Sequence, residues 1–391
     1  MRRVYLDCNA TTPVDSEVLA AMLPFFAEAY GNASSIHSVG QEARAAGESA
    51  RAAVATLVGA KASEIVFTSG GTEADNLAIF GLVAGDRRER KHIIASPIEH
   101  HAVLNSVEAL EKQGIEVTWL PISSGGVIDP EDVRRALRPE TILITVMHAN
   151  NELGTIQPVA EIGRIASEAN VYFHCDAVQS AGKIPVAVNE MKVDFLALSA
   201  HKFYGPKGVG ALYVRENSPL EPMLFGGTHE RDRRAGTENV AGIVGMGKAA
   251  DLARAQLADE PARLAVLRDR LEDGILASVC DVRVNGDRAR RMANTTNFTF
   301  AHAEGESLVI ALDLQGVQCS TGAACSSGAI LTSHVLRAIG LPRDEAKCTL
   351  RFSLGRFSTC EDVDYALEVI PGVVERLRAI SPTYSKAVSA R

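Results

Sequence analysis

A lysine and a cysteine in this 391-residue chain stand in surroundings that favour chemistry over packing. Lys202 follows the apolar run "LALSA", and the chain breaks soon afterwards at Gly205 and Pro206. A lysine amine at a strand end is well placed to form a Schiff base, and an exposed turn lysine is the alternative. Cys325 stands among small residues in "STGAACSSGAI", where no bulky side chain covers a thiol. An isolated cysteine is otherwise a small buried hydrophobic residue.

The run "FTSGGTEADN" predicts an anion site between a strand and a helix. Gly70, Gly71 and Thr72 lie where strand-like residues end and a helical pattern begins. Unpaired N–H groups at the start of a helix, its dipole and the Thr72 hydroxyl would bind a phosphate together. Ser199, close to Lys202, is a second candidate for the same phosphate. A plain glycine turn is the alternative.

A carboxylate also follows a strand, in "FHCDAVQS". Asp176 there could pair with a protonated pyridine nitrogen, which is the electron-sink requirement of pyridoxal 5'-phosphate (PLP) chemistry. Gln179 comes one helical turn later and could donate to the ring oxygen of such a cofactor. The alternative for Asp176 is a helix N-cap.

Two polar runs complete the candidate set. In "IEHHAVLN", a histidine at position 100 or 101 could stack on a cofactor ring and carry protons near neutral pH. Paired histidines also bind metals, but no carboxylate or cysteine at metal-ligand spacing accompanies this pair, so we expect no resident metal. Asn150 and Asn151 end an apolar strand and are either turn residues or hydrogen-bonding groups in a cleft.

The elements that must position these residues alternate between short apolar strands and longer helical patterns. The strand-like runs include "EIVFTSG", "HIIASP", "TILITVMHAN", "VYFHCDA", "DFLALSA" and "GALYVR". This alternation predicts an α/β fold with a largely parallel sheet and helices on both faces. Ligands of such sheets lie beyond the carboxyl ends of the strands, where the lysine, the anion site, Asp176 and the histidine pair all fall. Residues 251–279 read as one long charged amphipathic helix leading into a smaller α+β part.

Composition excludes several classes of protein. Apolar residues make up 46% and charged residues 23% of the chain, as in ordinary globular proteins. The net charge of −8 argues against a nucleic-acid surface, and no apolar run is long enough for a membrane span or a secretory signal. Seven cysteines without a CxxC pair suggest neither a zinc knuckle nor a disulfide framework. We therefore expect a protein of the reducing cytoplasm.

The chain resembles the cysteine desulfurases of the NifS/IscS type, which are PLP-dependent transferases of fold type I. The likeness runs from "VYLDCNATTP" to "SLGRFST" and depends on the runs "TSGGTEADN", "EHHAV", "MHANNE", "HCDAVQ", "SAHKFYGPKG", "RRAGTEN", "STGAACSSG" and "RFSLGRF". It implies a large PLP-binding domain over residues 14–256 with a mostly parallel seven-stranded sheet. A smaller α+β domain would comprise residues 1–13 and 257–391 and carry the catalytic cysteine loop at about 318–334.

The resemblance also implies roles for individual residues. Lys202 would carry PLP and act as the base, His100 would stack on the ring, Asp176 would face the pyridine nitrogen and Gln179 the ring hydroxyl. The phosphate would be held by Gly71, Thr72, Ser199, His201 and, from the partner subunit of a homodimer, Thr237. The substrate carboxylate would be held by Asn151 and Arg351. Asn151 would also contact the cofactor. Arg356 is the alternative for Arg351.

Cys325 matches the nucleophile of this family, which lies on a mobile loop in the longer-loop subclass. The implied reaction takes sulfur from L-cysteine, releases L-alanine and leaves a persulfide on Cys325, which is also a candidate transient iron–sulfur ligand. The persulfide would pass to an iron–sulfur scaffold or another sulfur acceptor, for nitrogenase-type clusters, general clusters or transfer-RNA thiolation. A selenocysteine lyase, a PLP aminotransferase or a non-catalytic sulfur-relay protein are the alternatives. Cys8, Cys175 and Cys319 are given no catalytic role.

Overall fold

The computed structural model describes residues 2–321, 332–381 and 384. Its largest element is a seven-stranded sheet with the strand order β2-β8-β7-β6-β5-β3-β4. The strands are β2 (Ile65–Thr68), β3 (His92–Ala95), β4 (Glu116–Trp119), β5 (Thr141–Thr145), β6 (Tyr172–Asp176), β7 (Phe195–Ser199) and β8 (Gly210–Val214). All pairings from β4 to β7 are parallel, and β8 runs antiparallel to both of its neighbours. The predicted α/β fold with a mostly parallel seven-stranded sheet is therefore confirmed.

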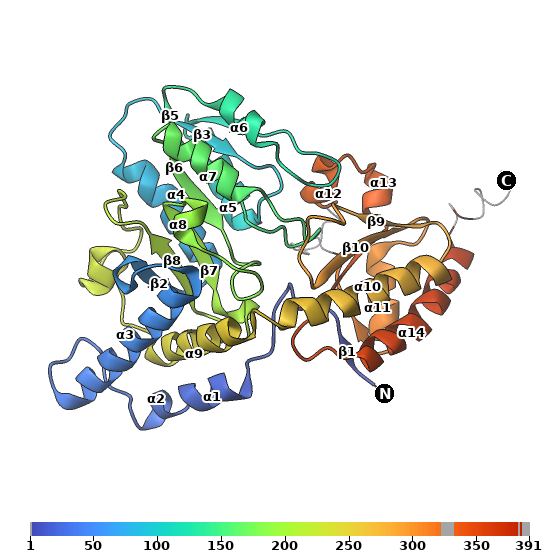
Figure 1. Cartoon of the computed structure of the whole chain (residues 1–391), viewed down its shortest axis with the longest axis horizontal. Helices are drawn as coiled ribbons and strands as arrows, with labels where there is room; N and C mark the ends of the chain where they lie inside the picture. The colour runs from blue at the N-terminus through green and yellow to red at the C-terminus, as the bar shows by residue number, and fades with distance from the viewer. Residues whose placement is uncertain (1, 322–331, 382–383, 385–391) are drawn as a thin grey trace.

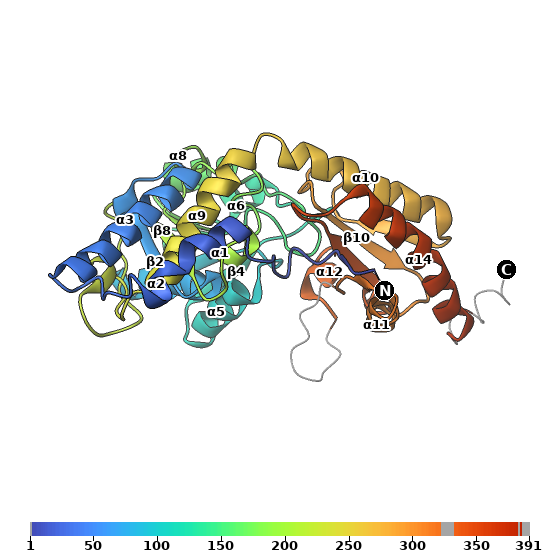
Figure 2. The same cartoon turned by 90° about the horizontal axis from the view of Figure 1, so that it is seen from below.

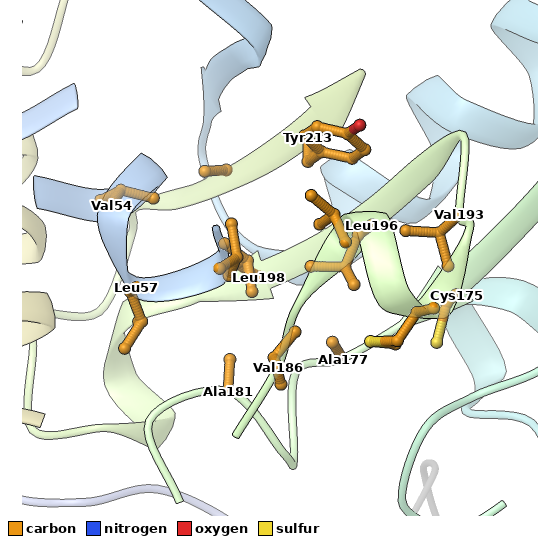
Figure 3. Close-up of a cluster of buried hydrophobic side chains, with 14 of the residues drawn as sticks. Val54, Leu57, Cys175, Ala177, Ala181, Val186, Val193, Leu196, Leu198 and Tyr213 are labelled. Atoms are coloured by element: carbon orange, nitrogen blue, oxygen red, sulfur yellow. The ribbon is translucent and has the colours of Figure 1, made fainter. Parts of the chain in front are cut away.

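Both faces of this sheet are covered by helices. Alternate residues of a strand point to opposite faces, and in the buried strands both sets are apolar, so each face needs a cover. In β7, Leu196 and Leu198 belong to one apolar cluster, and Phe195 and Ala197 belong to another. The first cluster, part of which is drawn in Figure 3, contains residues of α3 (Ser38–Val58), α6 (Pro130–Ala136), α7 (Val159–Glu168), α8 (Val188–Met191) and α9 (Val240–Gln256). The second contains residues of α4 (Gly71–Gly85) and α5 (His101–Lys112).

A second body of secondary structure lies beside the large sheet (Figures 1 and 2). It is built on an antiparallel sheet with the order β12-β10-β9. Its elements are α10 (Glu260–Ser278), β9 (Val282–Asn285), β10 (Thr295–Phe300), α11 (Gly305–Asp313), β11 (Val317–Gln318), α12 (His334–Ala338), α13 (Arg343–Ala346), β12 (Thr349–Ser353) and α14 (Cys360–Ala379).

The two ends of the chain meet in this smaller body. Strand β1 (Val4–Tyr5) pairs in parallel with β11, and Val4 and Leu6 are buried in the same apolar cluster as residues of α10, α11 and α14. The chain then crosses to the large sheet through α1 (Ser16–Met22) and α2 (Pro24–Ala27). We propose the division into residues 14–256 and residues 1–13 with 257–391 as the domain limits, because the large apolar clusters follow it.

The single long helix expected over residues 251–279 is wrong. The structure has two helices there, α9 ending at Gln256 and α10 beginning at Glu260. Pro261 stands in the first turn of α10. Its ring removes a backbone N–H and clashes with the preceding turn, so proline is tolerated at the start of a helix and not in its interior. The sequence pattern continued across the break because both helices carry a charged outer face.

Among the helices in the described ranges, none combines the length and the apolar character that crossing a membrane requires.

Candidate active site

A cavity opens at the carboxyl ends of the parallel strands, and most of the predicted site residues line it. Those lining it are Gly71, Thr72, His100, Asn151, Asp176, Gln179, Ser199, His201 and Lys202. They come from the segments that follow β2, β3, β5, β6 and β7. Parallel strands end at the same edge of a sheet, so residues more than 100 positions apart in the sequence meet there.

The start of α4 forms one wall of this cavity. The helix begins at Gly71, directly after the turn that follows β2, and its first N–H groups have no partner inside the helix. A Cβ atom on Gly71 would lie 2.7 Å from Cγ2 of Val178, so only glycine lets the two segments approach this closely. Thr72 is exposed into the same cavity. The arrangement is an anion-binding helix start.

A buried carboxylate lies across the cavity. Asp176 is the last residue of β6, and its Oδ1 accepts a hydrogen bond of 2.8 Å from the backbone N–H of Val178. It therefore caps a turn rather than a helix. Burial raises the pKa of Asp176 to about 6, against the lowering effects of that hydrogen bond and of Lys202. A cationic ring nitrogen beside it would favour the ionised carboxylate further.

Lys202 enters the cavity from a short 3₁₀ turn, Ala200–Lys202, that follows β7. Its Nζ donates to two carbonyl oxygens of the N-terminal segment, that of Asn9 at 2.6 Å and that of Ala10 at 2.8 Å. Burial lowers the pKa of Lys202 to about 7, with further lowering from Lys183 and Arg351. A substantial fraction of this amine is thus neutral at pH 7, which a base or a Schiff-base nucleophile requires.

His100, and not His101, lines the cavity. His100 caps the start of α5, and its Nδ1 accepts a hydrogen bond of 3.1 Å from the N–H of Ala102. In the neutral ring the proton therefore sits on Nε2. Burial lowers the pKa of His100 to about 4, so the ring is neutral at pH 7. His101 packs against His334 instead, with 4.8 Å between the ring centres.

Arg351 and Arg356 have different surroundings. Arg351, on β12, donates to the backbone oxygen of Asn151 at 2.9 Å and to Asp7 at 2.6 Å, and its Nε has no partner. Arg356 is held between two carboxylates, Asp15 at 3.2 Å and Glu260 at 3.0 Å. Only Arg351 therefore lies beside a cavity residue with a donor to spare. Asn150 is a turn residue, since its Oδ1 accepts from two backbone N–H groups and its Nδ2 donates to a backbone oxygen.

Among the described residues, two of the predicted site residues do not line this cavity. Arg351 lies one residue away from it, behind Asn151. Thr237 lies in a neighbouring hollow beside Thr68 and Ser69. Cys325 lies outside the described residues.

The cysteines that were given no catalytic role are buried. Cys175 is fully enclosed in the core drawn in Figure 3, and Cys319 belongs to the core of the smaller body. Both are small core residues, as expected. Cys8 is also buried, and burial raises its pKa to about 12.

Sequence reasoning missed several acidic and apolar residues at the site. Asp75, Met147 and Val178 also line the cavity. Asp75 comes one helical turn after Gly71, so the helical period itself placed both on one face. Asp75, His100 and Asp176 have potential ligand atoms within 4.8 Å of one another. They are part of the cofactor cavity, and we assign no metal to them.

Glu99 is a further buried acid at the site. Its Oε1 accepts a hydrogen bond of 2.7 Å from the N–H of Met147, and its Oε2 has no partner. Burial raises the pKa of Glu99 to about 8. The folded chain holds the Glu99 proton more tightly than the unfolded chain does, so protonation of Glu99 favours folding. This contribution is fully present below the pKa of Glu99 in the unfolded chain and is lost as the pH rises through about 8.

Glu99→Gln should therefore stabilise the cofactor-free chain at high pH. We expect the free energy of unfolding, relative to the parent, to rise by roughly 3 kcal/mol between pH 5.5 and pH 9, because the amide cannot ionise. Urea unfolding at both pH values measures this. Glu111→Gln, on the exposed side of α5, is the matched control and should show a flat difference. A pH-independent effect of Glu99→Gln would contradict the prediction.

The residues of the cavity fit PLP. The helix start at Gly71 suits a phosphate, Asp176 suits a protonated pyridine, and the enclosed Lys202 amine suits the aldehyde. Gly71 leaves the room that a larger residue would fill. The fold and this cavity thus define a PLP-dependent enzyme of fold type I.

Comparison with known proteins identifies the family within that class. The chain belongs to the class-V aminotransferase family, whose model matches residues 4–366. It is 52% identical over 381 residues to the cysteine desulfurase IscS of Dictyoglomus turgidum, covering 97% of each chain. It is 50% identical over 385 residues to the cysteine desulfurase IscS of Methanosarcina thermophila, covering 98% of this chain and 95% of that one.

Solved structures show the same relationship. A NifS-like protein aligns with a TM-score of 0.90 at 38% identity, over 96% of this chain and 100% of the other. The structure of SspA in complex with cysteine aligns with a TM-score of 0.81 at 39% identity, over 91% of this chain and 100% of that one. These likenesses confirm the predicted fold, cofactor and class of enzyme.

Proposed function

We propose that this chain is a cysteine desulfurase, which converts L-cysteine to L-alanine and keeps the sulfur as a persulfide on Cys325. The observation that carries the proposal is the meeting of Lys202, Asp176 and His100 in one cavity, opposite the helix start at Gly71. Relatives that are about 50% identical over nearly the full chain are named cysteine desulfurases.

PLP bound here would act as an electron sink for the bond cleavages at the substrate Cα and Cβ atoms. The chain's own residues move the protons. Lys202, whose amine is partly neutral at pH 7, takes the Cα proton. The Asp176 carboxylate would hold a proton on the ring nitrogen of the bound cofactor. His100, whose ring proton sits on Nε2, would donate a hydrogen bond to the substrate sulfur and so favour its thiolate form.

The sulfur then passes to Cys325. Its thiolate attacks the substrate sulfur, so an S–S bond forms and the C–S bond breaks. The electron pair of the broken bond stays with the carbon skeleton, which takes up a proton and leaves as alanine. The atoms balance without an external oxidant, because the thiol and cysteine become a persulfide and alanine.

Described residues on either side of Cys325 are anchored close to the cavity, which supports this step. Ser320 exchanges two backbone hydrogen bonds with Arg351. On the other side, Ser333 donates to the buried Glu152 at 2.6 Å, and His334 Nε2 is 2.9 Å from the backbone oxygen of Glu99.

Arg351 would hold the substrate carboxylate with Asn151, since a guanidinium presents a fork of donors to a carboxylate. Arg351→Lys should raise the KM for cysteine about 100-fold and change kcat far less, because the lost bidentate contact is present throughout the reaction. Steady-state alanine formation measures both constants. Arg356→Lys is the matched control and should leave KM near that of the parent. The reverse pattern would assign the carboxylate to Arg356.

We further propose a cytoplasmic homodimer in which Thr237 reaches the partner's cofactor phosphate. Thr237 lies outside the cavity of its own chain, and exposed apolar residues stand nearby in the sequence at Met223, Leu224 and Phe225.

An iron–sulfur scaffold or another acceptor protein would receive the sulfur. Alanine and sulfide assays with cysteine, repeated with candidate acceptors, test the function: an acceptor should speed turnover, and absence of alanine formation would refute the proposal.

A further inference from the structure

A second half-buried lysine lies against a residue of the cavity and has no part in the mechanism above. Lys183 follows the turn that carries Gln179, and its Nζ lies 3.1 Å from Oε1 of Gln179. The other end of that amide, Nε2, donates to the backbone oxygen of Asn9 at 2.9 Å. The same oxygen accepts the hydrogen bond of 2.6 Å from Lys202. Three hydrogen bonds thus connect the two lysines through Gln179 and Asn9.

These contacts determine how the Gln179 amide is oriented. An ammonium group only donates hydrogen bonds, and a backbone oxygen only accepts them. A reversed amide would face its N–H groups toward the Lys183 ammonium and its oxygen toward the oxygen of Asn9. Both contacts would be repulsive. The observed orientation leaves the second N–H of Nε2 as the polar group that Gln179 offers to the cavity it lines.

We propose that Lys183 is a positioning residue, which holds the Gln179 amide with its N–H groups toward Asn9 and the cavity and thereby fixes the acceptor of Lys202. The proposal rests on the proposed function only for the meaning of the N–H offered to the cavity, where a ring oxygen would accept it. The series of hydrogen bonds from Lys183 through Gln179 and Asn9 to Lys202, called the relay below, consists of residues of this chain and exists without cofactor.

The electrostatics of Lys183 agree with this role. Burial lowers the pKa of Lys183 to about 8, and the groups that act on it from the surrounding elements are Cys8, Arg351 and Glu260. Burying an ammonium costs free energy, so a lysine used only for packing would gain from replacement by an apolar side chain. After burial itself, Lys183 is also the largest cause of the lowered pKa of Lys202.

The test separates the relay from the plain effect of a nearby charge. Competitive acetylation of the full-length, cofactor-free chain, followed by mass spectrometry, gives the pH midpoint at which Lys202 becomes reactive. Lys183→Met should raise this midpoint by about one pH unit. Lys183→Arg keeps a cation that only donates hydrogen bonds, so the midpoint of Lys202 should stay at the value of the parent. Lys207→Met removes the same charge from an exposed site five residues from Lys202 and should leave it unchanged.

The double variant Lys183→Met/Gln179→Leu decides between the two mechanisms. Lys183→Met should shift the midpoint less than half as far in the Gln179→Leu background, because the relay is already broken there. An equal shift in both backgrounds, or no shift in either, would overturn the proposal. Lys183→Gln replaces Lys183→Met if the latter does not fold. Visible absorption of the PLP-loaded parent tests the proposed function separately, since acetylation of the unloaded chain does not depend on it.

Discussion

Lys202→Ala should purify without covalently bound cofactor and lose at least ~10³-fold in alanine formation from cysteine. The substitution removes the only amine that lines the cavity in the described part of the chain, and with it both the covalent link to PLP and the Cα base. Asp176 and the helix start at Gly71 remain, so PLP should still bind without a covalent bond. Borohydride reduction followed by mass spectrometry, together with visible absorption, measures the link, and an alanine assay measures the turnover.

Lys207→Ala is the matched control for that variant. Lys207 is an exposed lysine of the same run and lies outside the cavity, so its removal should leave cofactor content and turnover as in the parent. A borohydride-reducible cofactor adduct at another lysine of Lys202→Ala, with normal turnover, would remove Lys202 from the site. Slow residual exchange of cofactor in Lys202→Ala would leave the assignment of Lys202 unchanged.

Cys325→Ser should keep its bound cofactor and lose alanine formation by a factor of at least ~10³, because a serine hydroxyl at pH 7 cannot replace a thiolate nucleophile. Substrate should still bind to the variant, since Arg351 and Asn151 are unchanged. Visible absorption after addition of cysteine reports binding, and the alanine assay reports sulfur transfer. The two readouts separate loss of the nucleophile from loss of the cofactor site.

Cys319→Ser provides the control for a general effect of thiol removal. Cys319 is buried in the core of the smaller body, and burial raises its pKa far above the usual range of a thiol. Its replacement by serine should lower stability and leave the rate of the folded enzyme near that of the parent. Full turnover by Cys325→Ser, or loss of sulfur transfer from Cys319→Ser alone, would transfer the nucleophilic role away from Cys325.

Local sequence patterns were sufficient for the elements and for the residues at their ends. Most strands of the large sheet are short apolar runs, and Asp176, Ser199 and Lys202 stand at or directly after such runs. The helix break at residues 257–259 was missed because amphipathic spacing continued on both sides of it, although Pro261 marked the start of the second helix.

What the sequence by itself determined is therefore the α/β class, the helix start at Gly71 and the places of Lys202 and Asp176 at the ends of strands. These depend on spacing along the chain, which fixes the period of each element and the residues at its end. Only the tertiary structure decided that Asn9 supplies the acceptor of Lys202 and that Arg351, not Arg356, lies beside Asn151. It also decided that the Glu99 carboxyl is buried and that Lys183 lies half-buried against Gln179. Such facts depend on which distant segments exclude water together, and contacts between residues hundreds of positions apart leave no period in the sequence.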